Sequence, residues 1–422
     1  MKTSFNFFFL IFLISIYSYG NYILIPMDKD SQANHLKAYG IAYWVLQNNL
    51  EVDWLLNYRG GSFLIKSANE ISSECIYRGV SFEILSNNDV NSILNSISSP
   101  SSNTDIIKLE KAPKIAVYSP KNKQPWDDAV TLALTYAEIP YDLIYDDEIL
   151  NDLLPMYEWL HLHHEDFTGQ YGKFYRSFKN ASWYIEQKKL FEENAKNNGF
   201  SKVSHQKLAV AKKIKEYIAG GGFTFAMCSA TDSFDIALSA EGVDICKSMF
   251  DGDKMEQNAQ EKLNFNQTLA FQNFKIIEDP NKYEFSDIDM TDTRRKLISE
   301  ENDFFTLFEF SAKWDPVPTM LCQNHTRIIK GFIGQTTSFS KELIKPNVII
   351  MGENKSLNEA RYIHGKFGKG TWTFYGGHDP EDYRHKIGDP KTELELYPNS
   401  PGYRLILNNI LFPAAKKKKQ KT

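Results

Sequence analysis

The sequence predicts an α/β protein with a mostly parallel sheet that helices cover on both faces. Short apolar runs typical of buried strands alternate with longer segments of helical periodicity, which is the pattern of β–α–β units. The 422 residues, 42% of them hydrophobic and 14% aromatic, suffice for a large core and more than one domain. The main sheet is predicted to contain the strands Lys114–Ser119, Tyr141–Tyr145, Tyr157–His163 and Phe223–Met227, with helices at Trp126–Ala137 and Lys207–Ala219.

An additional α/β unit is predicted at residues 21–110. Tyr22–Met27 and Glu51–Leu56 have strand patterns, and Leu36–Leu46 between them has a helical one. A Ser- and Pro-rich stretch at 95–103 marks a linker or a long surface loop. The main α/β domain then spans 111–412, with a strand-rich insertion at about 257–370 that ends in a glycine turn before a last core strand.

The first 20 residues have the pattern of a signal peptide. Lys2 precedes the apolar run Phe7–Ile14, and Ser18 and Gly20 are small residues at the −3 and −1 positions of a cleavage site. An uncleaved anchor is the alternative, although the apolar run is short for a bilayer span. We therefore expect an exported protein, periplasmic or extracellular, with no stable membrane span after cleavage. Residues 413–422 are expected to form a basic, disordered tail.

Several classes of function have no support in the sequence. The net charge of −5 and the pI near 6.0 argue against nucleic-acid binding. The chain has no phosphate-binding loop, no dinucleotide fingerprint and no H-E-x-x-H motif, so ATP or NAD chemistry has no anchor. The four widely spaced cysteines form neither a disulfide framework nor a zinc ribbon. We predict no cofactor from these motifs, and we expect a small molecule or a carbohydrate as the ligand.

Polar segments follow three of the predicted strands. They are 161–170, 227–233 and 376–382, and they contain most of the residues suited to catalysis. In open α/β sheets, ligands bind beyond the carboxyl ends of the strands. If the three strands are parallel neighbours, the three segments face one crevice.

The segment 227–233 has the layout of a nucleophile elbow, in which a strand, a sharp turn and a helix follow one another. Cys228 stands at the turn, with the small residues Ala226 and Ala230 two positions away on either side. The helix N-terminus would lower the pKa of the thiol, and the Ser229 N–H would hold an oxyanion. The alternative is a buried cysteine that packs as a small apolar residue.

The segment 376–382 offers a base for this thiol. His378 is the candidate base, and Glu381 or Asp379 would orient its ring. Gly376 and Gly377 indicate a close backbone approach or a positive φ. The alternative is a histidine whose hydrogen bonds are satisfied within a loop.

The first segment, HLHHEDFTGQ, admits a wall of the pocket or a metal site. On a strand, His161 and His163 would share one face and His164 would take the other. We expect hydrogen-bonding histidines that line the pocket, and a weaker candidate for a zinc site is formed by His161, His163 and His378. Glu165 or Asp166 would complete the ligand shell in that case.

The order of these features resembles the class I glutamine amidotransferase fold, whose sheet has a flavodoxin-like strand order. Members of that family carry G-x-C-x-G at the elbow and H-x-E near the end of the domain. The resemblance implies that Cys228, His378 and Glu381 form a Cys–His–Glu triad. Two alanines replace the elbow glycines here, and His378 and Glu381 are three positions apart instead of two. The segment from Lys366 to Asp379 also resembles the ThuA-like branch of this superfold.

Most of the mature chain resembles an exported bacterial family, of the Bacteroidetes type, that carries the label asparagine synthetase B. The resemblance is carried by Ile25–Asp28, Asn34–Trp44 and Leu55–Gly61. Glutamine-dependent asparagine synthetases need a cysteine directly after the initiator Met and an S-G-G-x-D-S loop. This chain has Lys2 directly after the initiator Met and lacks the loop, so the label implies no such reaction.

Three hypotheses of function follow from the sequence. The first is an amide or ester hydrolase with Cys228 as nucleophile and His378 as base. The second is a non-catalytic or carbohydrate-binding module, in which some of the 22 Tyr, 29 Phe and 7 Trp stack on sugars. The third is a metal-dependent hydrolase that uses His161, His163 and His378.

Overall fold

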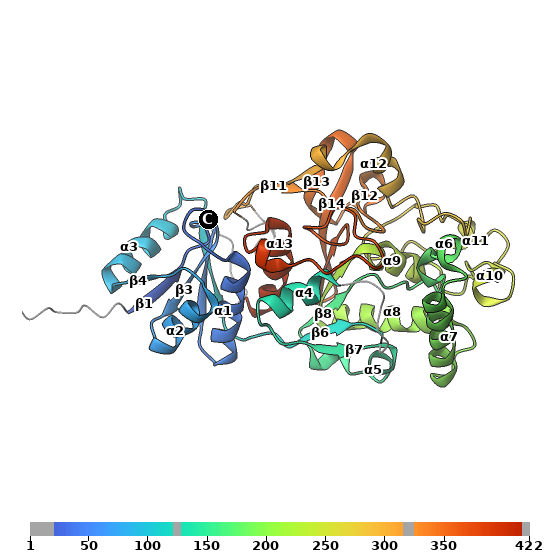
Figure 1. The fold of residues 1–422 in the computed structure, drawn as a ribbon, viewed down its shortest axis with the longest axis horizontal. Coiled ribbons are helices and arrows are strands. Elements are labelled where there is room, and N and C mark those ends of the chain that lie inside the picture. Colours follow the sequence, from blue (N-terminus) through green and yellow to red (C-terminus); the bar gives the residue numbers. More distant parts are fainter. Residues whose placement is uncertain (1–20, 121–127, 315–324, 416–422) are drawn as a thin grey trace, which may run out of the picture.

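The computed structural model describes residues 21–120, 128–314 and 325–415, which fold into two sheets with covering helices (Figure 1). The predicted signal peptide and basic tail lie outside the described residues, apart from 413–415. Cys75, Cys228 and Cys246 are buried and free, and Cys322 lies outside the described residues. Among the helices that the structure describes, none is long and apolar enough to cross a membrane.

The smaller sheet is formed by the N-terminal segment, and all its neighbouring strands are antiparallel. The predicted β–α–β unit is present in split form, because β3 lies antiparallel between β1 and β2. The two strands therefore run in the same direction without touching. The strands across the sheet are β4 (Glu83–Leu85), β1 (Tyr22–Ile25), β3 (Ser62–Lys66), β2 (Val52–Leu56) and β5 (Asp105–Leu109).

Helices cover both faces of this sheet because successive side chains of a strand point to opposite faces. In β1, Ile23 and Ile25 join the core beneath α1 (His35–Gln47) and α2 (Asn69–Arg78). Leu24 points the other way and packs with Val90 and Ile97 of α3 (Asn87–Ser98). Most residues of these strands are therefore apolar.

The larger sheet is mixed rather than mostly parallel, which corrects the prediction. Five strands are parallel, in the order β7 (Asp142–Ile144), β6 (Ile115–Tyr118), β8 (Trp159–Leu162), β9 (Phe223–Met227) and β15 (Gly370–Tyr375). The antiparallel strands beyond β15 are β14 (Glu359–Phe367), β13 (Ile349–Asn354), β10 (Phe304–Leu307) and β11 (Ile328–Lys330), and β12 (Phe339–Ser340) pairs with β14.

Short connections explain the antiparallel half. A parallel pair needs a long crossover, whereas a tight turn joins only antiparallel strands. Phe367 pairs with Gly370, so only Gly368 and Lys369 form the turn between β14 and β15. Gly368 has a φ of +60°, which glycine adopts without strain, and the predicted glycine turn before the last core strand is confirmed.

Helices lie on both faces of the larger sheet, as predicted (Figure 1). One face is covered by α4 (Ala129–Tyr136) and α13 (Pro401–Leu411), and the other by α5 (Asp146–Leu150), α8 (Val203–Gly220) and α9 (Asp232–Ser239). The remaining α-helices are α6 (Tyr175–Phe178), α7 (Ser182–Asn197), α10 (Ser248–Asp251), α11 (Ala259–Lys262) and α12 (Thr291–Leu297).

The two sheets are joined through α1, which packs against α4 and α13. Gly40 of α1 makes this possible, because a Cβ there would lie 1.9 Å from the carbonyl oxygen of Ala137. Polar contacts reinforce the junction. Arg404 donates to the hydroxyl of Tyr39 at 2.9 Å, and Tyr43 donates to the carbonyl oxygen of Pro113 at 2.6 Å.

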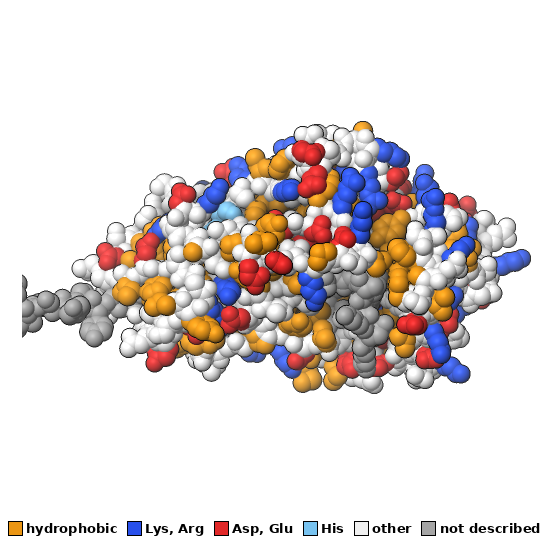
Figure 2. Space-filling view, viewed as in Figure 1, with side chains coloured by type: hydrophobic (Ala, Val, Ile, Leu, Met, Phe, Trp, Pro, Cys, Tyr) orange, Lys and Arg blue, Asp and Glu red, His pale blue; other side chains and the backbone are white. Residues whose placement is uncertain are grey.

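Acidic and basic side chains are mixed over much of the face shown in Figure 2. Lys and Arg side chains gather more densely over the region of β12 and α12. The whole chain carries a net charge of −5, so positive charge on this part of the surface is a local excess.

Candidate active site at the carboxyl ends of β8, β9 and β15

The three polar segments that follow β8, β9 and β15 meet at one edge of the larger sheet. These strands are parallel neighbours, so their carboxyl ends point to the same side. A cavity of about 670 Å³ opens there, and His164, Cys228 and His378 line it, one from each segment. The expectation that the three segments share one crevice is confirmed.

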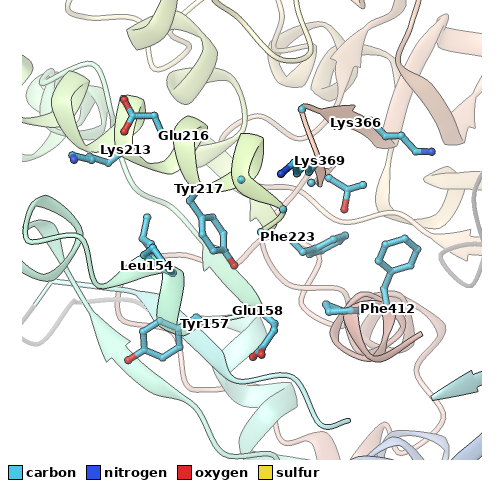
Figure 3. Close-up of a pocket in the computed structure, with 18 of the residues that line it drawn as sticks. Leu154, Tyr157, Glu158, Lys213, Glu216, Tyr217, Phe223, Lys366, Lys369 and Phe412 are labelled. Carbon is cyan, nitrogen blue, oxygen red and sulfur yellow. The ribbon is translucent and has the colours of Figure 1, made fainter. Parts of the chain in front are cut away.

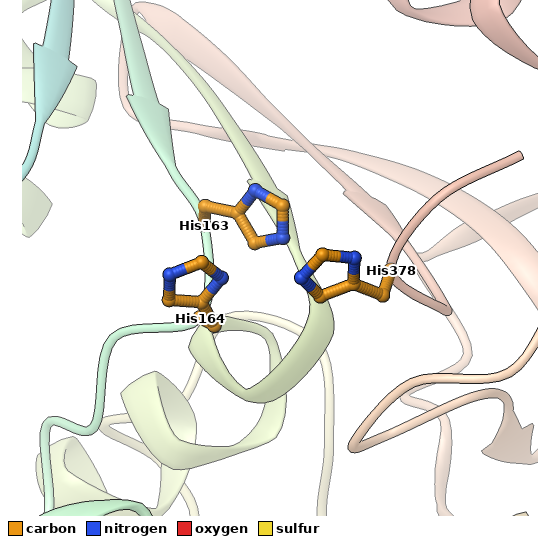
Figure 4. A group of neighbouring side chains, drawn as sticks. All are labelled: His163, His164 and His378. Atoms are coloured by element: carbon orange, nitrogen blue, oxygen red, sulfur yellow. The ribbon is translucent and has the colours of Figure 1, made fainter. Parts of the chain in front are cut away.

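Three imidazole rings converge beside this cavity (Figure 4). One ring nitrogen from each of His163, His164 and His378 lies within 4.8 Å of the other two, and these nitrogens point to the space between the rings. The ring centroid of His163 lies 4.2 Å from that of His164 and 4.6 Å from that of His378. Nitrogen ligands grouped in this way suit a transition-metal ion.

Asp128 orients one of these rings from the start of α4. Its Oδ1 caps the helix by accepting from the N–H of Thr131 at 2.9 Å. Its Oδ2 lies 2.8 Å from Nδ1 of His163 and 3.0 Å from Nε2 of His161. Burial opposes ionisation of Asp128, but the rings of His163 and His161 outweigh it and hold the pKa of the carboxyl well below its usual value. A fixed carboxylate thus leaves Nε2 of His163 for the cluster.

His161 does not join the cluster. It reaches Asp128 from the same side as His163, as the alternation along a strand predicts. Its Nδ1, however, lies 3.2 Å from the carbonyl oxygen of Phe225, so both ring nitrogens face acceptors. Neither His161 nor Asp128 lines the cavity.

His164 takes the place expected for His161. It was predicted to lie on the opposite face of the strand, but β8 ends at Leu162 and the alternation ends with it. The ring of His164 instead stacks on that of His378, with centroids 5.5 Å apart and planes 2° apart. The candidate metal ligands beside the cavity are therefore His163, His164 and His378, whereas His161 forms a second possible ligand group with Asp128 and His163.

His378 lies in a stack of three imidazole rings, between His164 and His385. The His385 ring lies 4.9 Å away at 5°, and its Nδ1 is 2.9 Å from Oδ2 of Asp382. Burial, followed by the nearby His163 and His385, lowers the pKa of His378 well below its usual value. The ring is therefore neutral near pH 7, which is the form that binds metals.

Two ring nitrogens of this group are buried without a hydrogen-bond partner among the described residues. They are Nε2 of His163 and Nδ1 of His378. Buried polar atoms in folded proteins nearly always have a partner, so these two nitrogens are open to a bound ion, a ligand or water. This observation agrees with a ligand-binding role for the cluster.

The glycines before His378 place the ring. Gly377 has a φ of +100°, and a Cβ there would lie 2.5 Å from the ring of Phe332. A Cβ at Gly376 would lie 2.3 Å from the carbonyl oxygen of Thr337. The predicted positive φ and close approach are both confirmed.

Cys228 stands at a sharp turn between β9 and α9, as predicted for an elbow. Its φ is +53°, a left-handed value that strains any residue with a Cβ. Burial raises the pKa of the thiol to about 12, against the opposing effect of hydrogen bonds from the N–H groups of Ser229 and Gln335 to the sulfur. The carboxylates of Asp289 and Asp232 raise this pKa further.

The carboxylates predicted to orient His378 have other partners. The carboxyl group of Glu381 accepts a hydrogen bond from Ser400. The side chain of Asp379 accepts from the hydroxyl of Thr392 at 2.8 Å. The carboxylate that acts on His378 electrostatically is instead Asp128.

Glu165 and Asp166 hold the loop that follows the histidines. Asp166 accepts from the backbone N–H groups of Thr168 at 2.6 Å and of Gly172 at 2.9 Å. An oxygen of Glu165 lies 3.6 Å from Nζ of Lys207, and burial raises the pKa of this carboxyl to about 7. Neither side chain lines the cavity, so both stabilise the loop after the histidines instead of contacting a ligand in the cavity.

A larger cavity of about 1060 Å³ lies at the opposite edge of the sheet, where β9 and β15 begin (Figure 3). Its lining includes four aromatic side chains, Tyr157, Tyr217, Phe223 and Phe412. Among the described residues that line it there is no histidine or cysteine. Such rings are what a carbohydrate-binding module would use, and that role remains a prediction.

Sequence reasoning missed four residues of the site. An Asp directly before a helical pattern is a typical N-cap, so the sequence indicates that role for Asp128. Nothing in the sequence indicates that its second carboxylate oxygen contacts the histidines. His164 and His385 are close in sequence to predicted residues, yet their positions depend on where strand and turn end. Gln335 comes from the strand-rich insertion, and no short motif connects it with Cys228.

Comparisons with known proteins give no family for this chain. No family model and no curated protein matches it. Among solved structures, the cytoplasmic proteins STM3548 and STM1381 of Salmonella typhimurium are 9% and 12% identical. Each match covers 72% of this chain and 100% of theirs, with TM-scores of 0.34 and 0.35. A β-galactosidase from Bacillus circulans is 10% identical over 65% of this chain and 29% of its own, with a TM-score of 0.26. Scores this low establish no shared fold.

Proposed function

We propose that this protein is a metal-dependent hydrolase of amide or ester bonds, with the ion held by His163, His164 and His378. The observation that carries the proposal is the convergence of three imidazole nitrogens within 4.8 Å of one another beside a cavity. Three protein ligands and one open position are the arrangement of catalytic zinc. His164 and His378 line the cavity, so the open position would face a substrate.

The surrounding residues fit such an ion. A tetrahedral zinc site needs ligand nitrogens about 3.4 Å apart, so small rotations of the rings would complete it. Asp128 would act as a positioning residue by fixing the tautomer and direction of His163. A bound ion would lower the pKa of its water and polarise the scissile carbonyl. The N–H groups of Ser229 and Gln335, which now point at the sulfur of Cys228, would stabilise negative charge on the carbonyl oxygen.

Metal analysis tests this proposal. The protein, loaded with zinc and freed of excess, is expected to hold one ion per chain by mass spectrometry and to hydrolyse p-nitrophenyl acetate only when loaded. His163→Ala and His378→Ala should each weaken zinc binding at least about 100-fold, since each removes a ligand. His205→Ala is the matched control, because His205 is an exposed histidine of α8. Unchanged zinc affinity in both ligand variants would contradict the proposal.

We also propose that the parallel half of the sheet belongs to the glutamine amidotransferase-like superfold. When its five strands are numbered by their order in the chain, their order across the sheet is 2-1-3-4-5, which is the flavodoxin-like order. The elbow follows the fourth of these strands, β9. Both features support the resemblance seen in the sequence.

A second candidate function is a cysteine hydrolase with Cys228 as nucleophile and His378 as base. The left-handed φ of Cys228 favours it, because strained residues of this kind gather at functional turns. The two mechanisms compete for His378, because a ring nitrogen that binds an ion cannot also accept a proton from the thiol.

Alkylation of the thiol separates the two candidates. A pKa of about 12 leaves Cys228 protonated at neutral pH, so we expect iodoacetamide to react with it at least about 1000-fold more slowly than with glutathione. Peptide mass spectrometry after timed quenching measures the rate at Cys228, with the buried Cys75 as an internal reference. Rapid alkylation of Cys228 alone would favour the cysteine mechanism and count against the metal one.

We propose, from the sequence of its first 20 residues, that the protein is exported. Expression in a bacterial host followed by fractionation tests this. The protein should appear outside the inner membrane with an N-terminus close to Asn21. An intact Met1 in the cytoplasmic fraction would contradict export.

A further inference from the structure

We infer that the substrate of this pocket carries an anionic oxygen group, a phosphate or a carboxylate, that binds to basic side chains around the cavity. The inference rests on the proposed function and names the class of substrate that the site would take. Among the described residues, six Lys or Arg side chains and two carboxylates, Glu284 and Asp292, line the cavity. The basic residues are Lys173, Arg176, Lys282, Arg295, Arg384 and Lys386.

Lys173 is the strongest part of the argument. Its side chain is only 2% exposed, and Nζ donates to the carbonyl oxygen of Ile277 at 2.6 Å. It forms no ion pair with any described residue. The carboxylates of Asp166, Glu284, Asp279 and Asp232 act on it from beyond ion-pair distance, so the buried ammonium has room for a directly bound anion, which would offset the cost of its burial. Burial lowers the pKa of Lys173 to about 8, which still leaves the amine mostly protonated at neutral pH.

The other five cations form an exposed rim, which we call the basic rim. None of them forms an ion pair within the part of the chain that the structure describes, whereas Asp292 is paired with Lys296 at 2.7 Å. Exposed Lys and Arg at other places on the surface often do form such pairs, as Lys212 does with Glu241. The guanidinium groups of the basic rim are therefore free to bind a carboxylate or a phosphate with two parallel hydrogen bonds.

The positions of these residues in the chain point in the same direction. They come from three segments, 173–176, 282–295 and 384–386, that are far apart in the sequence and meet at this cavity. A chain with a net charge of −5 places them there against its overall charge. Figure 2 shows Lys and Arg gathered over the region of α12, the helix that carries Arg295. Such a concentration attracts anions and orients them toward the histidines.

Titration calorimetry with inorganic phosphate tests the inference. The protein is first treated with EDTA, so that phosphate cannot bind through a metal ion. We expect saturable binding that weakens at least about tenfold in the double variant Arg295→Gln/Arg384→Gln, because two charge-assisted contacts are lost. Lys189→Gln is the matched control, since Lys189 is an exposed lysine of α7 and does not line the cavity, and its affinity should stay within about twofold of the wild type.

Further arms of the experiment make each outcome decisive. Each single variant is measured as well, so that a folding defect of the double variant leaves the answer intact. Titration with acetate distinguishes the two sources of anion: tighter phosphate indicates a phosphate ester, and tighter acetate indicates a carboxylate. Absence of binding of both anions, or equal affinity in wild type and rim variants, would overturn the inference. Anion binding without zinc binding would instead remove the metal-hydrolase proposal and leave the anion site standing.

Discussion

Asp128 performs two functions with the two oxygens of one carboxylate. Oδ1 caps α4 through Thr131, and Oδ2 contacts His161 and His163. Asn is also a good N-cap, so Asp128→Asn keeps the first function and loses the charge required for the second. We expect zinc affinity to fall by about 10- to 100-fold, as for other carboxylates that support a metal-binding histidine. Competition with a chromophoric chelator measures the affinity.

Thermal unfolding followed by circular dichroism serves as the control for Asp128→Asn. The melting temperature of the metal-free variant should stay close to that of metal-free wild type, because the cap is retained. Asp30→Asn, a change in an exposed carboxylate that does not line the cavity, should leave zinc affinity unchanged. Equal zinc affinities of Asp128→Asn and wild type would show that Asp128 does not support His163.

Site residues that directly follow a strand were predictable from the sequence, whereas site residues that come from other segments of the chain were not. Cys228 and His378 were found because a strand pattern ends directly before each segment, and parallel strands end at a common edge. His161 forms hydrogen bonds, as expected, but it does not line the cavity, and its partners, the carbonyl oxygen of Phe225 and the carboxylate of Asp128, are distant in sequence. A hydrogen bond to a carbonyl leaves no trace in the side-chain sequence.

Single elements were predicted better than their arrangement. The strand Phe223–Met227 has the same bounds in the structure, because Gly220–Gly222 and the elbow bracket a short apolar run. The predicted strand Tyr157–His163 is shorter in the structure, where β8 is Trp159–Leu162, so His163 lies beside His164 in the following loop and both join the cluster. The direction of a strand and the choice of its neighbours depend on tertiary contacts. The sequence therefore did not reveal the mixed sheet or the position of β3 between β1 and β2.

The junction between α1 and α4 gives a prediction at the scale of elements. In an isolated helix, Gly→Ala is favourable by about 1 kcal/mol. At Gly40 a methyl group would lie 1.9 Å from the carbonyl oxygen of Ala137, so the helices would have to separate. We expect Gly40→Ala to lower the free energy of unfolding by about 1–3 kcal/mol, the range for overpacking. Urea unfolding followed by tryptophan fluorescence measures it.

Gly220→Ala is the matched control for this change. Gly220 is the last residue of α8, and nothing lies within 4 Å of a Cβ placed there. The control should be neutral or slightly stabilising. A Gly40→Ala protein as stable as the wild type would show that α1 and α4 are less closely packed than in the structure.

For the molecule as a whole, buried titratable groups act on stability in opposite directions. Burial raises the pKa of Glu165 to about 7 and those of Asp235 and Asp289 to about 6. These folded-state values exceed the unfolded ones, so the three carboxyls favour the folded state as the pH falls from about 7 to about 4. Burial lowers the pKa of His35 and His364 to about 3, which has the opposite effect.

His364 allows the histidine contribution to be isolated, because it lies in β14 away from the candidate site. Its unfolded pKa is near 6.5 and its folded pKa about 3, so the unfolded state binds a proton first as the pH falls. Its contribution to stability is complete above pH ~6.5 and is lost progressively toward pH ~3; at pH ~5 the loss is at most about 2 kcal/mol.

His364→Gln keeps a polar partner for Thr373 and removes the titration. Between pH ~7 and ~5, unfolding free energies from urea titration should therefore fall less in His364→Gln than in wild type, by up to about 2 kcal/mol. His205→Gln, a change at an exposed histidine, should follow the wild type, and parallel pH profiles for all three proteins would show that His364 titrates normally in the folded state.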